Sequence, residues 1–70
     1  MANKEPTEMT TAESYHWAAD QAQESADNAI FSARTTKYGF EKSNYLSVAA
    51  QKLRDVKTFE AAATMSELFD

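Results

Sequence analysis

The fold is decided by residues 12–36, which read AESYHWAADQAQESADNAIFSARTT. Mostly small residues recur here at alternating intervals of three and four, the spacing of the a and d positions of a coiled-coil heptad. This seam comprises Ala12, Tyr15, Ala19, Ala22, Ala26, Ala29, Ala33 and Thr36, and it is flanked by Ala18, Ser25 and Ser32. The pattern predicts an alanine-rich helix whose narrow face lets a second helix approach closely.

Signals at both ends set the expected bounds of this helix. Thr10 and Glu13 match a capping box, in which the two side chains satisfy free amides of the first turn, so the helix should begin near Thr11. Gly39 is the one glycine of the chain and should end the helix in a left-handed conformation, directly after Tyr38.

The rest of the chain is expected to supply a second helix. We predict a polar, flexible leader at 1–9, a first helix at about 11–38, a turn at 39–44 capped by Ser43 or Asn44, and a second helix at about 45–68. Two helices joined by a short turn are expected to pack antiparallel. With facing residue numbers that add up to about 82, Asp27 should lie near Arg54 and Glu24 near Lys57.

The second helix carries two apolar stripes rather than one. Its first half presents Tyr45, Leu46, Ala49, Ala50, Leu53 and Val56, and its second half presents Phe59, Ala62, Ala63, Ser66 and Phe69. The second stripe is rotated by roughly a quarter to a third of a turn relative to the first. Thr58 could therefore cap a short third helix, but we favour one continuous helix.

The aromatic residues of the first helix lie outside its alanine seam. Trp17, Phe31 and Tyr38 share the f position of the heptad, and Ile30 lies beside them. We predict that these four residues bind a partner, because aromatic side chains are enriched in the buried centres of interfaces. The expected fold is an all-α hairpin that completes a helical bundle by oligomerisation or partner docking. A dimeric four-helix bundle is the simplest closed form, and a head-to-tail contact would give a filament.

Composition removes several classes of function. The 70 residues include no cysteine and one histidine, which argues against disulfides and zinc sites and fits a reducing cytoplasm. The sequence has no apolar run of the length needed to cross a bilayer. His16 and Asp20 lie one helical turn apart, but no second histidine or nucleophile completes a metal or catalytic set, so we expect neither a cofactor nor an enzyme.

These observations favour a small, non-enzymatic protein–protein interaction module: an assembly subunit, an adaptor, or an inhibitor of a larger complex. The alternative is a nucleic-acid-linked regulator that uses Arg34, Lys37 and Lys42, among which Tyr38, Phe40 and Tyr45 are interspersed. A net charge of -4 weighs against nucleic acid as the partner, because such binding relies on clustered basic residues. An apolar ligand inside a completed bundle is a third option.

Overall fold

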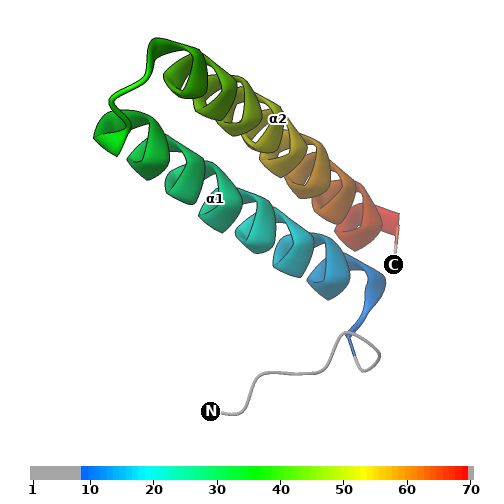
Figure 1. Cartoon of the computed structure of the whole chain (residues 1–70). Helices are drawn as coiled ribbons and strands as arrows, with labels where there is room; N and C mark the ends of the chain where they lie inside the picture. The colour runs from blue at the N-terminus through cyan, green and yellow to red at the C-terminus, as the bar shows by residue number, and fades with distance from the viewer. Residues whose placement is uncertain (1–8, 70) are drawn as a thin grey trace.

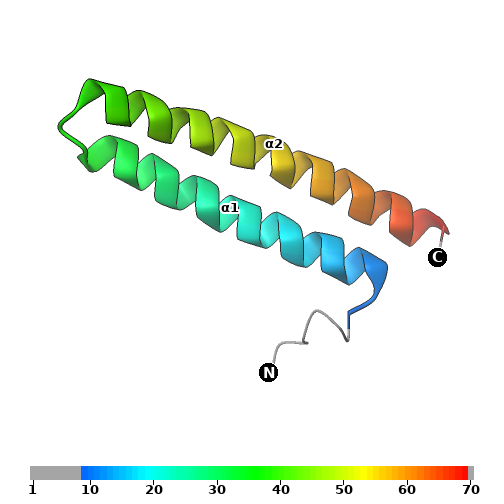
Figure 2. The same ribbon diagram turned by 45° about the vertical axis from the view of Figure 1, so that its right-hand side comes forward.

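The computed structural model describes residues 9–69 and consists there of two α-helices. Helix α1 spans Thr11–Thr35 and helix α2 spans Gly39–Phe69. The chain runs up α1, turns, and returns along α2, so the start of α1 and the end of α2 lie at the same end of the hairpin (Figures 1 and 2). We call this the open end and the opposite one the turn end. The antiparallel two-helix arrangement is as predicted, and the predicted leader lies outside the described residues except for Met9.

The start of α1 is fixed by the capping box. The backbone amide of Glu13 donates to the Thr10 hydroxyl at 3.2 Å, and the backbone amide of Thr10 donates to the Glu13 carboxylate at 3.1 Å. Thr10 itself has an extended backbone, as an N-cap residue should. The predicted start at Thr11 is confirmed.

The end of α1 and the turn differ from the prediction. Helix α1 ends at Thr35 rather than at Tyr38, because Thr36 has an extended backbone and only its amide closes the last turn, donating to the Ser32 carbonyl at 3.0 Å. The Thr35 hydroxyl donates to the Phe31 carbonyl at 3.1 Å, a side-chain bond that occupies a carbonyl near the helix end. Helix α1 therefore ends before Gly39 is reached, where the backbone of Thr36 leaves the helical conformation.

The predicted turn at 39–44 is instead the beginning of α2. Gly39 does not adopt a left-handed conformation, and the amide of Lys42 already donates to the Tyr38 carbonyl at 3.0 Å. The Thr36 hydroxyl donates to the Glu41 carboxylate at 2.7 Å, which ties the turn to the first turn of α2 and leaves a negative charge near its amino end. The connection is therefore only residues 36–38, and neither Ser43 nor Asn44 is needed as a cap.

Helix α2 is continuous through Thr58, as favoured above. The Thr58 hydroxyl donates to the Arg54 carbonyl at 3.1 Å, one turn back along the same helix. A threonine that bonds in this way stays inside a helix instead of capping a new one. The residue therefore does not start a third helix.

The early turn also shifts the pairing of the two helices. Ala22 and Val56 belong to one core cluster, so facing residue numbers add up to about 78 and not to the predicted 82. Within residues 9–69 no ion pair joins Asp27 to Arg54 or Glu24 to Lys57. The Asp27 carboxylate instead accepts a hydrogen bond from the Gln23 amide at 3.0 Å, within α1.

The core between the helices is made of small side chains. Among the described residues the buried apolar ones are eight alanines and one valine: Ala12, Ala19, Ala22, Ala26, Ala29, Ala33, Ala49, Val56 and Ala63. The six from α1 all belong to the predicted seam, and the three from α2 recur every seven residues, which is the interval of a heptad. No large side chain of the described chain is fully buried.

The predicted first stripe of α2 is only partly in the core. Ala49 and Val56 are buried, but Leu46 and Leu53 remain 48% and 39% exposed. With the corrected pairing these two leucines lie beside the seam rather than in it. Neither helix in the described part of the chain is long and apolar enough to cross a membrane.

Candidate interaction surface

The hairpin leaves most of its large apolar side chains in solvent. Eleven such residues within the described range are exposed: Trp17, Phe31, Tyr38, Phe40, Tyr45, Leu46, Val48, Leu53, Met65, Leu68 and Phe69. Scattered exposed apolar residues are normal on a protein surface. Here, however, the exposed apolar side chains are together far larger in volume than the buried alanines. Their positions on the hairpin therefore indicate where a partner could bind.

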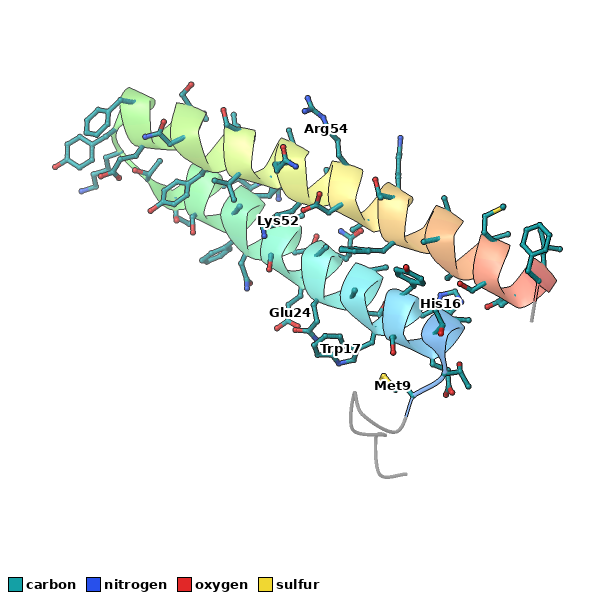
Figure 3. All side chains as sticks on the ribbon, turned by 90° about the vertical axis from the view of Figure 1, so that its right-hand side faces the viewer. Met9, His16, Trp17, Glu24, Lys52 and Arg54 are labelled. Carbon is teal, nitrogen blue, oxygen red and sulfur yellow. The ribbon has the colours of Figure 1, made fainter. Side chains whose placement is uncertain are left out.

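The hairpin has two broad sides, separated by the seam. The first is marked by a contact between the His16 ring and the Glu67 carboxylate, whose Nε2 and Oε1 atoms lie 2.7 Å apart at the open end. Figure 3 shows His16 on this side, near the end of α2. Because seven residues nearly complete two helical turns, residues seven or fourteen positions from His16 and Glu67 lie on the same side.

We call this first side the charged side. Its middle and open end are polar, and toward the turn it becomes apolar through Ile30, Leu46 and Leu53. Residues three or four positions from these rows can also lie on this side, because such residues are neighbours on a helix surface. The charged members of the side are Glu13, Asp20, Asp27, Arg34, Lys57, Glu60 and Glu67. Such a surface is well hydrated, and charged groups are depleted from the centres of protein interfaces.

The opposite side is the small-residue side. It is marked by a shallow hollow of about 270 Å³, lined by Trp17, Ala18, Gln21, Ala22, Ser25, Lys52, Asp55 and Phe59. Along α1 the two rows that form this side are Ala18, Ser25, Ser32 and Gln21, Asn28, Thr35, without a charged residue among them. Along α2 it contains Tyr45, Val48, Gln51, Asp55, Phe59 and Ala62.

Aromatic side chains shape the hollow. The ring of Phe59 packs against the buried Ala19, Ala22 and Val56 cluster, and it stacks on Tyr15 with ring centroids 6.5 Å apart. Trp17 forms the outer rim of the hollow and is 44% exposed. In Figure 3 its indole projects from the surface of α1 that faces away from α2. The hollow therefore has an apolar floor and an aromatic edge.

The four residues predicted to bind a partner are not gathered into one patch. Trp17 borders the small-residue side, whereas Ile30 is half-buried on the charged side. Phe31 and Tyr38 are 68% and 59% exposed. Trp17, Glu24 and Phe31 recur at seven-residue intervals on the outer row of α1, and Figure 3 shows Trp17 and Glu24 pointing away from α2.

The three basic residues of the alternative prediction do come together. Arg34, Lys37 and Lys42 are all exposed at the turn end, and no ion pair within residues 9–69 involves them. Two exposed rings accompany them, because Tyr38 and Phe40 lie with centroids 5.9 Å apart. Thus cations and aromatic faces share one end of the hairpin.

His16, the one histidine of the chain, lies at the open end on the charged side. His16 contacts Glu67 across the helices rather than Asp20 along α1. No group of three or more metal-ligating side chains occurs between residues 9 and 69, and no polar or charged residue of that range is buried. Comparisons of the chain with protein-family models, with curated proteins and with solved structures give no match.

Proposed function

We propose that this protein is a non-enzymatic protein–protein interaction module whose helical bundle is completed by a protein partner. Assembly subunit, adaptor and inhibitor of a larger complex are the roles that fit such a module. The observation that carries the proposal is the contrast between a core of eight alanines and one valine and eleven large apolar side chains left in solvent.

The energetics of so small a core support the proposal. Burying one methyl-sized group contributes about 0.8 kcal/mol, whereas fixing the backbone of one residue costs roughly 1–2 kcal/mol. Chains of this length without disulfides or metals usually need further burial to be stable. Covering the exposed aromatic and aliphatic residues with a partner would supply it.

The proposal predicts a marginal hairpin when the chain is alone. At high dilution the full chain should bind a dye that reports exposed apolar surface, and it should unfold at low denaturant concentration. Raising the concentration, or adding a partner, should remove the dye signal and shift the midpoint upward. A dilute chain that excludes the dye and unfolds cooperatively at a midpoint independent of concentration would contradict the proposal.

Side-chain replacement gives a second test of the same idea. Trp17→Ala combined with Phe31→Ala should weaken association while leaving the helical circular dichroism signal nearly intact, because neither side chain belongs to the buried seam. Glu24→Ala is the matched control, since Glu24 lies on the same outer row between them. Association that is equally strong in all three proteins would count against these two residues as contacts.

The turn end supports a second candidate function, a nucleic-acid-linked regulator. Three exposed cations beside two exposed rings are the groups that hold single-stranded nucleic acid through phosphates and stacked bases. Such binding to a labelled single-stranded oligonucleotide should weaken steeply with salt, and Lys37→Ala with Lys42→Ala should reduce the salt dependence. No binding at low salt would exclude this function.

A further inference from the structure

We infer that the partner covering the small-residue side is a second copy of this chain, docked antiparallel so that each turn end lies over the open end of the other copy. The inference rests on the proposed function and goes further by naming the partner, the side and the orientation. Three properties of the described residues lead to it.

The first property is the distribution of charge between the two sides. On α1 every charged residue from Glu13 to Arg34 lies on the charged side or on the outer row, and the rows beginning at Ala18 and Gln21 have none. Serine and alanine on these rows allow close approach of another helix, and their neutral polar neighbours can exchange hydrogen bonds across it. This side can thus be buried without removing charges from water, apart from those on Lys52 and Asp55.

The second property is self-complementary shape. The hollow lies nearer the open end, between Trp17 and Phe59. Nearer the turn, the same rows of α2 carry Tyr45 and Val48, which are 37% and 47% exposed. A two-fold axis across the middle of the side would place Tyr45 and Val48 of each copy toward the hollow of the other. Each contact is then made twice, as in an isologous interface.

The third property is the unequal charge of the two halves, which selects the orientation. Residues 27–51, the turn half, contain three basic and two acidic residues, a net charge of +1. The described remainder, 9–26 with 52–69, contains three basic and six acidic residues, a net charge of -3. Antiparallel docking sets the positive half of one copy against the negative half of the other, whereas parallel docking sets like charge against like.

Antiparallel docking also determines which residues meet. Helix α1 then faces α1 of the other copy, and α2 faces α2 of the other copy. The two-fold axis passes near the middle of α1, between Ser25 and Asn28. Ala18 of one copy should lie opposite Thr35 of the other, at equal distances from the axis. Gln23 and Ile30 also lie at equal distances from this axis, one on each side of it, but on the charged side of the hairpin. They therefore form a matched control pair.

The test is cross-linking between single-cysteine variants of the full chain, which has no cysteine of its own. Ala18→Cys and Thr35→Cys proteins are mixed and treated with a short bifunctional maleimide. The mixture should give a covalent dimer of twice the 7.8 kDa chain mass, in yield at least several-fold above either variant alone. The Gln23→Cys and Ile30→Cys mixture should give only the background yield.

Each other result overturns the inference. Efficient cross-linking of the Gln23 and Ile30 variants would place the contact on the charged side, and equal yields from single variants and mixtures would exclude the antiparallel orientation. A chain that stays monomeric excludes a second copy as partner. The dye and denaturant experiment then separates the two proposals, because a marginal, dye-binding monomer retains the proposed function and a stable, dye-excluding monomer refutes it as well.

Discussion

The two sides of this hairpin are built on the same alanine seam and yet have opposite character. The charged side holds the contact between His16 and Glu67 and further charged side chains along both helices. The small-residue side has uncharged rows along all of α1 and a hollow edged by Trp17. The difference teaches that a hairpin with a minimal core can still be asymmetric, with one side suited to water and the other suited to another helix pair.

The largest expected effect comes from the seam that both sides share. Ala26→Leu should lower the free energy of unfolding by about 1–3 kcal/mol, because Ala26 is fully buried and a larger side chain must push the helices apart. The midpoint of denaturant unfolding measures this change. Ala61→Leu, on the exposed outer row of α2, is the control and should shift the midpoint little.

A charge placed on the small-residue side should distinguish the two sides most clearly. Ser25→Arg should raise the dissociation constant of the dimer at least tenfold, about 1.4 kcal/mol, because the guanidinium would be buried without a partner. Gln23→Arg makes a similar change two residues away on the charged side and should leave the constant nearly unchanged. Sedimentation analysis compares them, and equal effects would remove the distinction between the sides.

A change in the turn should affect neither side but should test how the hairpin is closed. Gly39→Ala should raise the stability by about 0.4–1 kcal/mol, because Gly39 is helical and an added Cβ has no atom within 4 Å. The gain would come from restricting the unfolded chain. A loss of stability in thermal unfolding would instead support a left-handed glycine at this position.

The smallest effect is expected on the charged side itself. Glu67→Gln should lower stability by no more than about 0.2–1 kcal/mol, because both partners of the His16 contact are more than half exposed and such pairs contribute little. Glu60→Gln removes the same charge from the same side and serves as the control. A loss well above this range, measured by denaturant unfolding, would mean that the charged side contributes more to closing the hairpin than we describe.

Some of this architecture could be predicted from the sequence, because it depends on local patterns. The capping box at Thr10 needs only the two residues that form it, and the seam of α1 follows from an uninterrupted heptad of mostly alanine residues. The turn could not be placed by the same means. Gly39 is a strong local signal for a helix end, yet α1 ends at Thr35, and the hydroxyl of the extended Thr36 donates to the Glu41 carboxylate in the first turn of α2.

That displacement of the turn explains the other differences. A turn placed several residues too late raises the sum of facing residue numbers. For this reason Asp27 was expected near Arg54 and Glu24 near Lys57, and within residues 9–69 neither forms an ion pair. The difference in charge between the two sides could have been predicted from the sequence, because the uncharged rows of α1 repeat every seven residues. The prediction followed the large aromatic residues instead, and Trp17 and Phe31 lie on the outer row of α1 rather than on those uncharged rows.

The mass of the full chain in solution tests the proposed antiparallel dimer most directly. It is measured by light scattering after size exclusion, over a wide range of protein concentration and at two salt concentrations. We predict a dimer that dissociates on dilution and that dissociates at a higher protein concentration when salt is added, because opposite charges on the two halves attract each other across the interface. A monomer at every concentration would contradict the account, and so would a mass that keeps growing with concentration.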